Sequence, residues 1–346
     1  MASAKHKTSV PPKTQNQGTG AADTLSLDTT LRPVLWNEYI GQKNIKENLH
    51  ILLSAAKERE EQPEHILLYG PPGLGKTTLA HLITREMQGR MRATSGPAIE
   101  RVGDLASILT NLSAGDVLFI DEVHRLNKNI EEVLYPAMES GVLDIVIGKG
   151  PSARTVQLEL PRFTLIAATT RVALLSAPLR SRFSGGTFRL TYYTEDELIE
   201  IARRSARILD IQASDESLRE IARRSRATPR TVNYLLKRCR DFAQVRTSSI
   251  TPDIARQALE LLGIDHLGLT HTDRELLQFL IEKYNGGPTG LKTLAAALSE
   301  EEDTIEAVYE PYLMQIGLLE RTPRGRSVTS RAYEHLKSAL AQRTLV

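Results

Sequence analysis

The segment Gly70–Thr77, with the sequence G-P-P-G-L-G-K-T, has the spacing of a phosphate-binding loop, G-x-x-x-x-G-K-[ST]. Its glycines, among them Gly73 and Gly75, let successive backbone N–H groups point at a phosphate without Cβ clashes. We expect Lys76 to reach the β- and γ-phosphates of ATP and the Thr77 hydroxyl to ligate Mg²⁺. The alternative is an ordinary glycine-rich turn, but a buried strand predicted before the loop and a helix predicted after it favour nucleotide binding.

Two acids supply the complementary chemistry. Asp121 and Glu122 follow the apolar run Asp116–Ile120, 44 positions after Thr77. We expect Asp121, at the tip of a buried strand, to hold Mg²⁺ through a bound water, and Glu122 to polarise the water that attacks the γ-phosphate. An ordinary pair of acids at a strand end is the alternative. His124 completes a D-E-x-H pattern that also occurs in superfamily-two helicases, and we interpret it as a structural or relay residue.

Three further polar residues stand where they would act on the same phosphate. Thr170 follows another predicted buried strand, where a hydroxyl senses the γ-phosphate or orients the water, although a strand-capping role is the commoner one. Arg182 follows a short predicted helix at the domain edge, where an arginine neutralises charge on a neighbouring subunit's nucleotide; a surface ion pair is the alternative. Arg230 opens a later helix that would close over the phosphate. The other arginines of that region are interpreted as solvated: Arg203, Arg204, Arg223 and Arg224.

Composition limits the classes of protein to consider. The chain has 346 residues, of which 41% are hydrophobic and 25% are charged, enough for two or three domains with real cores. Cys239 is the single cysteine, so no internal disulfide forms and a reducing compartment is expected. No apolar stretch approaches the roughly 20 residues of a membrane-spanning helix. We therefore expect a cytoplasmic protein.

The elements that must position these residues follow from hydrophobic patterning. Buried strands alternate with helices, which predicts an α/β fold with a mostly parallel sheet covered on both faces. Two period-2 segments predict a β-hairpin over 142–160, with Gly148–Pro151 at its tip. The strands are predicted at 65–69, 116–120 and 163–168, and the helices at 77–87 and 130–139.

The chain divides into four parts by composition and periodicity. Residues 1–25 are polar and predicted to be disordered, and 26–193 form the large α/β domain. Residues 194–265 show helical periodicity alone, with Thr194 and Ser214 as N-caps. Residues 266–346 predict a winged-helix domain with helices at 273–284, 291–298 and 304–315 and a β-wing at 317–329. The net charge is only +2, but six basic residues from Arg321 onward face one acid, which indicates a solvated basic tail or a DNA contact.

Together these segments resemble the RuvB family of AAA+ ATPases from Leu31 to about Leu336. The motifs that carry the resemblance are Glu38–Gln42, Gly70–Thr78, Thr94–Glu100, Leu118–Glu122, Leu134–Glu139, Gly150–Arg154, Gly286–Pro288, Glu310–Leu313 and Arg321–Arg326. The chain departs from the family pattern after Phe183, where Ser184–Thr187 is one residue longer, and at Ser140–Gly141, where an acid and an aromatic residue are usual.

The resemblance implies a P-loop AAA+ domain, a small helical lid and a C-terminal winged-helix domain. It implies ATP or ADP with Mg²⁺ as ligands. By motif position, Lys76, Thr77 and Thr78 would bind phosphate, Thr170 would be sensor one, and Arg230 would be sensor two. Arg182 would be the finger that acts on a neighbouring subunit. Residues near the base and ribose would be Leu31, Arg32, Tyr39, Ile40 and Tyr193.

The resemblance also implies partners. Such subunits form homohexameric rings around duplex DNA at Holliday junctions and drive branch migration in recombination and repair. The hairpin at about 142–160 would dock on RuvA, RuvC would then resolve the junction, and Arg321 and Arg326 of the wing would touch DNA phosphates. The apolar positions Val142, Ile145 and Ile147 of this hairpin would otherwise be interpreted as core.

Two other functions are consistent with part of the sequence. A AAA+ clamp loader or replication initiator would share the phosphate loop and the acids, and dependence on a sliding clamp would identify it. A winged-helix regulator with a vestigial ATP site would bind ATP without turnover. The intact set of Lys76, Glu122 and Arg182 favours the branch-migration motor.

Overall fold

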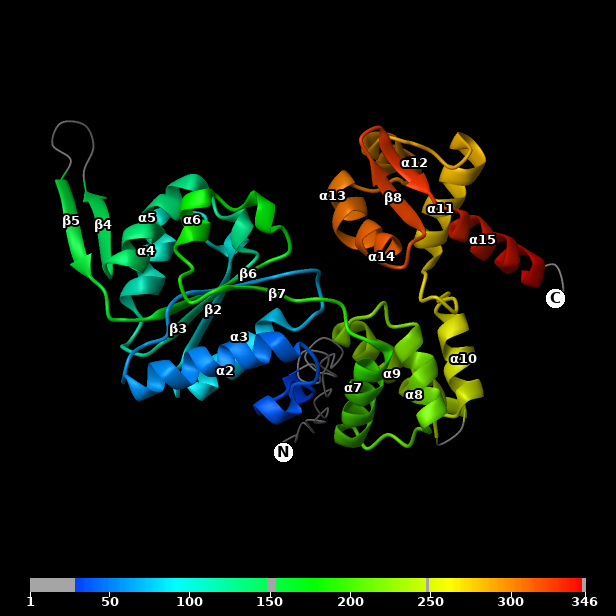
Figure 1. The fold of residues 1–346 in the computed structure, drawn as a ribbon, viewed down its shortest axis with the longest axis horizontal. Helices are drawn as coiled ribbons and strands as arrows, with labels where there is room; N and C mark the ends of the chain where they lie inside the picture. Colours follow the sequence, from blue (N-terminus) through cyan, green and yellow to red (C-terminus); the bar gives the residue numbers. More distant parts are fainter. Residues whose placement is uncertain (1–28, 148–153, 247–248, 344–346) are drawn as a thin grey trace, which may run out of the picture. The chain divides into compact units, whose positions relative to one another are not determined.

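The computed structural model describes residues 29–147, 154–246 and 249–343, apart from the side chains of 146, 147 and 338–343. The predicted disorder of residues 1–25 and the predicted hairpin tip, Gly148–Pro151, lie outside this range. The chain divides into two compact units, Met1–Arg32 and Pro33–Val346. In the first unit, the N–H of Arg32 donates to the carbonyl of Thr29. The elements described below all belong to the second (Figure 1).

A parallel five-stranded sheet forms the centre of the large domain. Its strand order is β2-β3-β6-β1-β7, and every pairing is parallel. The three strands predicted as buried are present, and β2 and β7 were missed. A half-exposed strand and a three-residue strand carry too little apolar patterning to be recognised. The strands are β1 (Ile66–Tyr69), β2 (Met91–Ser95), β3 (Val117–Asp121), β6 (Thr164–Thr169) and β7 (Thr187–Arg189).

Helices cover both faces of this sheet, as Figure 1 shows. Alternate strand residues supply two separate cores: Leu68 and Phe119 face α2 and α3, whereas Leu67 and Leu118 face α4, α5 and α6. Continuous burial on both faces explains why these strands are uninterrupted apolar runs. Truncating any of the fully buried leucines to alanine is expected to cost about 2–5 kcal/mol. The helices are α2 (Lys43–Glu58), α3 (Lys76–Glu86), α4 (Val102–Thr110), α5 (Lys128–Glu139) and α6 (Ala177–Ser181).

The predicted hairpin is present as a separate antiparallel pair, β4 (Val142–Ile147) and β5 (Arg154–Glu159). It lies at the edge of the large domain, apart from the five-stranded sheet (Figure 1). Leu143 is buried in the core beneath α5, whereas Val156 of β5 is 39% exposed. Val142 and Ile145 are half-buried, and the side chain of Ile147 lies outside the described residues.

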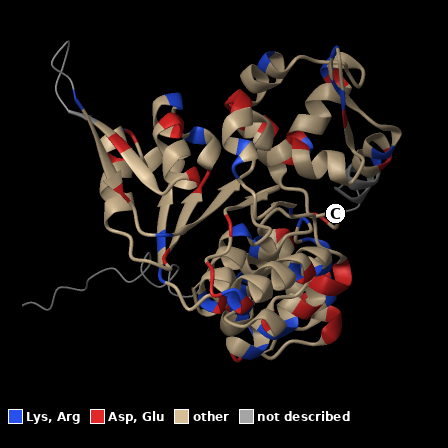
Figure 2. Cartoon of the chain, turned by 60° about the vertical axis from the view of Figure 1, so that its left-hand side comes forward, with Lys and Arg blue, Asp and Glu red and all other residues tan. Residues whose placement is uncertain are grey.

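The helical segment after Tyr193 forms α7 (Glu195–Ile208), α8 (Asp215–Arg223), α9 (Pro229–Arg246) and α10 (Pro252–Leu261). Both predicted N-caps are confirmed: Thr194 Oγ1 accepts from the N–H of Glu197, and Ser214 Oγ from the N–H of Ser217. Figure 2 shows basic and acidic residues side by side on these helices.

The interpretation of all four lid arginines as solvated was wrong for two of them. Arg224 is 7% exposed and pairs with Glu220, and Arg204 is mostly buried and pairs with Glu38 at 3.3 Å. Sequence periodicity does not show which arginine of a helix meets an acid from another segment.

The C-terminal domain has the predicted helices and wing, followed by a helix that was missed. The described residues of this domain form α11 (His271–Tyr284), α12 (Leu291–Leu298), α13 (Glu302–Thr304), a π-helical turn η6 (Ile305–Tyr309), α14 (Glu310–Gln315), β8 (Leu319–Thr322), β9 (Gly325–Val328) and α15 (Ser330–Arg343). Pro311 has no N–H to donate to a carbonyl one turn earlier, which accounts for the widened turn before it. The basic end of the chain is not a free tail, because Ala332 and Leu336 of α15 are buried in this domain's core, while Arg331 and Lys337 are exposed.

None of the helices that the structure describes is both long and apolar enough to cross a membrane.

Candidate active site

The sheet topology brings the predicted chemical groups to one edge. β1 lies beside β6, with Tyr69 paired to Thr169, and β6 lies beside β3, with Ala167 paired to Ile120. Because the carboxyl ends of parallel strands meet at the same edge, the loop after β1, the acids at the end of β3 and Thr170 after β6 converge there.

The phosphate loop adopts a backbone that only glycine allows at several positions. Gly70 has φ +144°, and a Cβ there would lie 2.5 Å from the carbonyl oxygen of Leu190. Gly75, in the left-handed region at φ +95°, is the N-cap of α3. Thr77 and Thr78 are half-buried in the first turn of that helix, where its positive end lies.

Lys76 is 7% exposed, and its ammonium donates to the carbonyls of Gly70 at 2.8 Å and Pro71 at 3.0 Å. Burial lowers the pKa of Lys76 to about 8, although Asp121 and Glu122 act to raise it. The partners of the Lys76 ammonium are therefore neutral carbonyl oxygens. A negatively charged phosphate oxygen can replace them and would bind the positive charge more strongly.

Asp121 and Glu122 are in contrasting environments although they are adjacent. Burial, together with the neighbouring Glu122, raises the pKa of Asp121, against the hydrogen bond that the N–H of Glu122 donates to Asp121 Oδ1. The carboxylate of Asp121 and the hydroxyl of Thr77 supply the hard oxygen ligands that Mg²⁺ prefers, and a cation at Asp121 would relieve the charge that burial disfavours. The residues present therefore fit a magnesium ion.

Glu122 is held by two donors. Its Oε2 accepts from Thr170 Oγ1 at 3.1 Å and lies 3.2 Å from His124 Nδ1. The hydrogen bond from His124, with that from Thr170, lowers the pKa of Glu122 to about 2 although burial opposes this. His124 Nδ1 also lies 2.9 Å from Thr169 Oγ1, so the histidine joins the ends of β3 and β6. The group expected to activate water is thus an ionised carboxylate.

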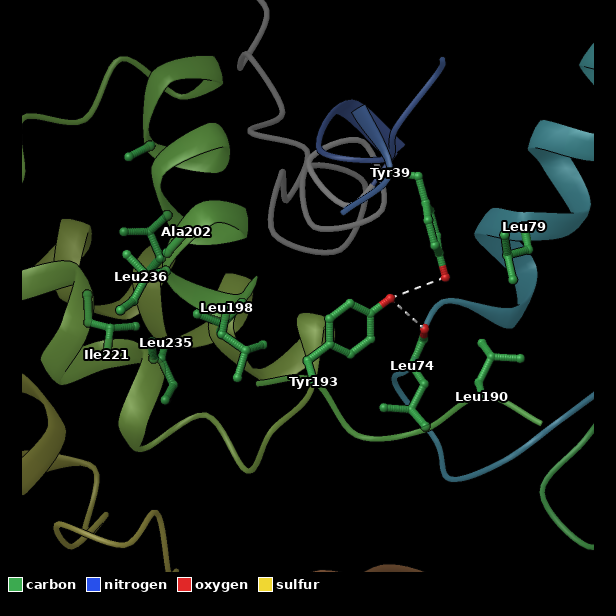
Figure 3. Close-up of a cluster of buried hydrophobic side chains, with 14 of the residues drawn as sticks. Tyr39, Leu74, Leu79, Leu190, Tyr193, Leu198, Ala202, Ile221, Leu235 and Leu236 are labelled. Atoms are coloured by element: carbon green, nitrogen blue, oxygen red, sulfur yellow. Dashed lines mark hydrogen bonds between the residues drawn. The ribbon is translucent and has the colours of Figure 1, made fainter. Parts of the chain in front are cut away.

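Two tyrosines adjoin the phosphate loop (Figure 3). The hydroxyls of Tyr39 and Tyr193 lie 3.2 Å apart, and that of Tyr193 donates to the carbonyl of Leu74 at 3.2 Å. Burial raises the pKa of Tyr193 to about 12, so it remains a neutral donor. Ile40 is half-buried beside Tyr39. Leu31 and Arg32 belong to the N-terminal unit, and their role stays a prediction.

Arg230 meets the phosphate loop from the first turn of α9. Its N–H donates to the carbonyl of Gly73 at 3.3 Å, and a Cβ on that glycine would approach Arg230 Cβ to 3.1 Å. A cavity of about 250 Å³ adjoins the loop here. Tyr192 and Thr228 line it too, although neither was predicted. Each is next to or near a predicted residue, Tyr193 or Arg230, and its own side chain carries no separate signal in the sequence.

Arg182 follows α6 and contacts its own large domain. Its Nη2 lies 3.0 Å from Glu139 Oε1, and its Nη1 donates to the carbonyl of Pro178 at 2.7 Å. The guanidinium also lies over the ring of Tyr135, 4.4 Å from the centroid. Among the contacts given by the described residues, none joins Arg182 to the phosphate loop. In the loop after Phe183, the N–H of Gly185 donates to the carbonyl of His65, the residue before β1, at 2.9 Å.

The two wing arginines are tied to acids of their own domain. Arg326 Nε donates to Glu310 Oε1 at 2.6 Å, and Glu310 is only 1% exposed. Arg321 pairs with Glu306 at 3.1 Å as well as with Glu310. Arg324, at the turn of the wing, is exposed.

Comparison with known protein families shows matches to three family models, which together cover most of the chain. Its residues 31–190 match the model of the Holliday junction DNA helicase RuvB P-loop domain. Residues 193–265 match that of the RuvB AAA lid domain, and residues 266–337 that of the RuvB C-terminal winged helix domain. The chain belongs to the RuvB family.

Individual relatives agree with this membership. The chain is 59% identical over 315 residues to the Holliday junction branch migration complex subunit RuvB of Dehalococcoides mccartyi, covering 91% of this chain and 90% of that protein. It is 50% identical to the solved Thermotoga maritima RuvB Holliday junction branch migration motor, with a TM-score of 0.82 over 89% of this chain and 98% of that one. A point mutant of the Thermotoga protein gives a TM-score of 0.83. The α/β fold with a P-loop domain, lid and winged helix is thereby confirmed.

Proposed function

We propose that this protein is the ATP-hydrolysing DNA motor that drives branch migration of Holliday junctions. Membership of the RuvB family supports the function, and the convergence of Lys76, Glu122 and Thr170 at one sheet edge supports an active ATPase. The boundaries of its parts are proposed at 26–193, 194–265 and 266–346.

In this mechanism Lys76 and the backbone of Gly73 and Gly75 bind the triphosphate, with Thr77 and Thr78 at the start of α3. Thr77, and Asp121 through a water, would hold Mg²⁺, which when bound neutralises charge on the transferring phosphoryl group. Glu122 accepts the proton of the attacking water once nucleotide binding draws Thr170 away from its carboxylate. Glu122 is already ionised, so it needs no prior proton loss.

The other proposed roles concern the lid, the neighbouring subunit and the base. Arg230 closes on the γ-phosphate from the lid, and Arg182 acts on the nucleotide of the next subunit in a homohexameric ring. Leu31, Arg32, Tyr39, Ile40 and Tyr193 surround the base and ribose.

The partners are proposed from the family. RuvA docks on the hairpin at about 142–160, duplex DNA passes through the ring with contacts from Arg321 and Arg326, and RuvC resolves the junction afterwards. The exposed face of β5, including Val156, is available for such docking.

The test is ATP turnover of wild type, Lys76→Ala, Arg182→Ala and a mixture of the two variants, with junction DNA and RuvA present. We expect each variant alone to lose at least about 100-fold in turnover, because each removes charge stabilisation of the phosphoryl group. The mixture should recover activity, since Lys76→Ala subunits supply the finger to intact sites of Arg182→Ala subunits. Turnover of Arg182→Ala equal to wild type would remove Arg182 from the mechanism, and a failure to move junctions despite turnover would remove the motor function.

A further inference from the structure

Three polar side chains lie along one face of α5 at intervals of four residues: Glu131, Tyr135 and Glu139. The remaining surface of the helix carries Leu134 and Ala137, which are buried in the core. The polar face therefore has a fixed orientation, and it is turned toward α6 and the residue that follows it, Arg182.

The guanidinium of Arg182 is held on one face and along its edges. Tyr135 lies against the face, the carbonyl of Pro178 accepts from Nη1, and Glu139 pairs with Nη2. The Nε atom is buried, and the described residues give it no hydrogen-bond partner. The side chain of Arg182 is 19% exposed, whereas that of Glu139 is 56% exposed. The ring of Tyr135 thus covers one face of the guanidinium, whereas the carboxylate of Glu139 is exposed to solvent.

Tyr135 is anchored independently of Arg182. Its hydroxyl lies 3.0 Å from Glu131 Oε2 and 3.0 Å from Ser176 Oγ, and Ser176 also donates to Glu131 at 2.6 Å. Ser176 is the N-cap of α6, accepting from the N–H of Leu179. The same network therefore fixes the ring and the start of the short helix that carries Arg182.

The end of α5 is anchored as well. His65 Nε2 donates to the carbonyl of Met138 at 3.0 Å, and its Nδ1 accepts from the N–H of Leu165 at 2.9 Å. The residue before β1 is thereby joined to the turn of α5 that presents Glu139.

From this geometry we propose that Tyr135 is a positioning residue for the Arg182 finger and that Glu139 is its exchangeable counter-ion. The proposal rests on the proposed function, in which Arg182 acts on a neighbour's phosphates. A planar guanidinium over a ring can present an N–H edge to a phosphate that approaches from the side, and in Arg182 this edge is the one that Glu139 now occupies. An exposed carboxylate binds weakly, so a triphosphate of higher charge displaces it, while the ring contact persists.

The first test compares Tyr135→Leu with the matched variant Tyr135→Phe, which keeps the ring and loses the hydroxyl. We expect Tyr135→Leu to lower kcat about 10-fold, because a finger no longer held by the ring is misplaced at the neighbour's phosphate. Tyr135→Phe loses the hydroxyl anchor but keeps the ring over Arg182, so its kcat should fall by no more than about threefold, and KM for ATP should change little in either variant. A mixture of Tyr135→Leu with Lys76→Ala should recover turnover, a result that a general loss of structure would not give.

The second test is a double-mutant cycle with Arg182→Ala. If Tyr135 acts through Arg182, adding Tyr135→Leu to Arg182→Ala causes no further loss in kcat. Additive losses, or wild-type kcat in Tyr135→Leu, would overturn the proposal while leaving the finger in place. Wild-type turnover of Arg182→Ala would instead overturn the finger assignment on which the proposal rests. If Tyr135→Leu does not fold, Tyr135→Met fills the space without a ring and takes its place.

Glu139→Gln tests the counter-ion separately. It retains the shape of an exposed side chain, and we expect kcat at or above the wild-type value because the competing charge is gone. A tenfold fall would mean that Glu139 is needed in the hydrolysing state and would overturn its exchangeable role.

Discussion

The candidate ATP site and the wing both contain basic residues, but their partners differ in kind. Lys76 is bound by backbone carbonyls and Arg182 by an exposed carboxylate, whereas Arg326 is bound by Glu310, which is 1% exposed. A carbonyl or a solvated acid is readily exchanged for phosphate. A buried carboxylate is not, because removing its partner leaves an uncompensated charge. Lys76 and Arg182 therefore have partners that a ligand can displace, whereas Arg326, proposed to contact DNA, also stabilises its own domain.

The largest effect is expected in the ATP site, from Glu122→Gln. Loss of the carboxylate that is proposed to accept the proton of water should lower kcat about 10²–10⁴-fold, while ATP binding is retained. Turnover and binding of a fluorescent ATP analogue measure the two effects. Glu132→Gln, an exposed acid in α5, is the matched control and should behave as wild type. Near-normal turnover of Glu122→Gln would show that this acid only pairs with His124 and Thr170.

A smaller effect is expected in the wing, from Arg326→Ala. Loss of the arginine leaves Glu310 buried with only Arg321 as a partner, so the free energy of unfolding of this domain should fall by about 3 kcal/mol. Hydrogen exchange in α11 and α14 measures the loss.

The matched variant Arg324→Ala should leave stability within about 0.5 kcal/mol, because the side chain is exposed. It should instead weaken DNA binding. The slope of the logarithm of the binding constant against the logarithm of the salt concentration should become shallower by about 1. If Arg326→Ala weakens DNA binding without any change in hydrogen exchange, Arg326 does not stabilise its domain, and the contrast between the wing and the ATP site is wrong.

The smallest effect distinguishes two titratable groups, His65 of the large domain and Asp265 of the C-terminal domain. Burial lowers the pKa of His65 below its ordinary value of 6.5, so the unfolded chain takes up the proton first. The stability from neutral His65 is complete above about pH 6.5 and declines as the pH falls toward the folded pKa, by at most about 1.4 kcal/mol per pH unit.

Asp265 of the C-terminal domain behaves differently. Burial, the largest influence, acts to raise its pKa, but hydrogen bonds from His335, Leu269 and Leu267 together lower it. Its contribution is lost only below about pH 4, as the pH falls through the folded pKa. Between pH 7.5 and 5.5 we therefore expect His65 to weaken the large domain while Asp265 has no effect.

Urea unfolding followed by the fluorescence of Trp36, the single tryptophan, reports on the large domain. His65→Gln should flatten its pH dependence over this interval. An equal slope in wild type and variant would show that another group is responsible.

Much of the candidate site was predictable because it depends on local rules. The glycines of Gly70–Gly75 specify a backbone, Lys76 and Thr77 open a helix, and the polar residues after β3 and β6 end buried runs. Since parallel strands present their carboxyl ends together, recognising three strands was enough to predict that Lys76, Glu122 and Thr170 converge.

Other features were decided by tertiary packing alone. The hydroxyl of Tyr193 reaches that of Tyr39 across 154 positions of sequence, and α15 forms because Ala332 and Leu336 find a core to enter. The residues next to these positions in the sequence do not predict either feature.

By itself the sequence determined the chemistry available: a phosphate loop, two acids, a threonine and a set of arginines at defined positions. Only the tertiary structure decided which charges remain exchangeable, because this depends on how deeply each partner is buried. Arg182 meets the ring of Tyr135 and an acid in solvent, whereas Arg326 meets an acid in a core. The sequence specifies which side chains are present and how they are spaced along an element. The desolvation of a charge, in contrast, depends on every group that packs around it.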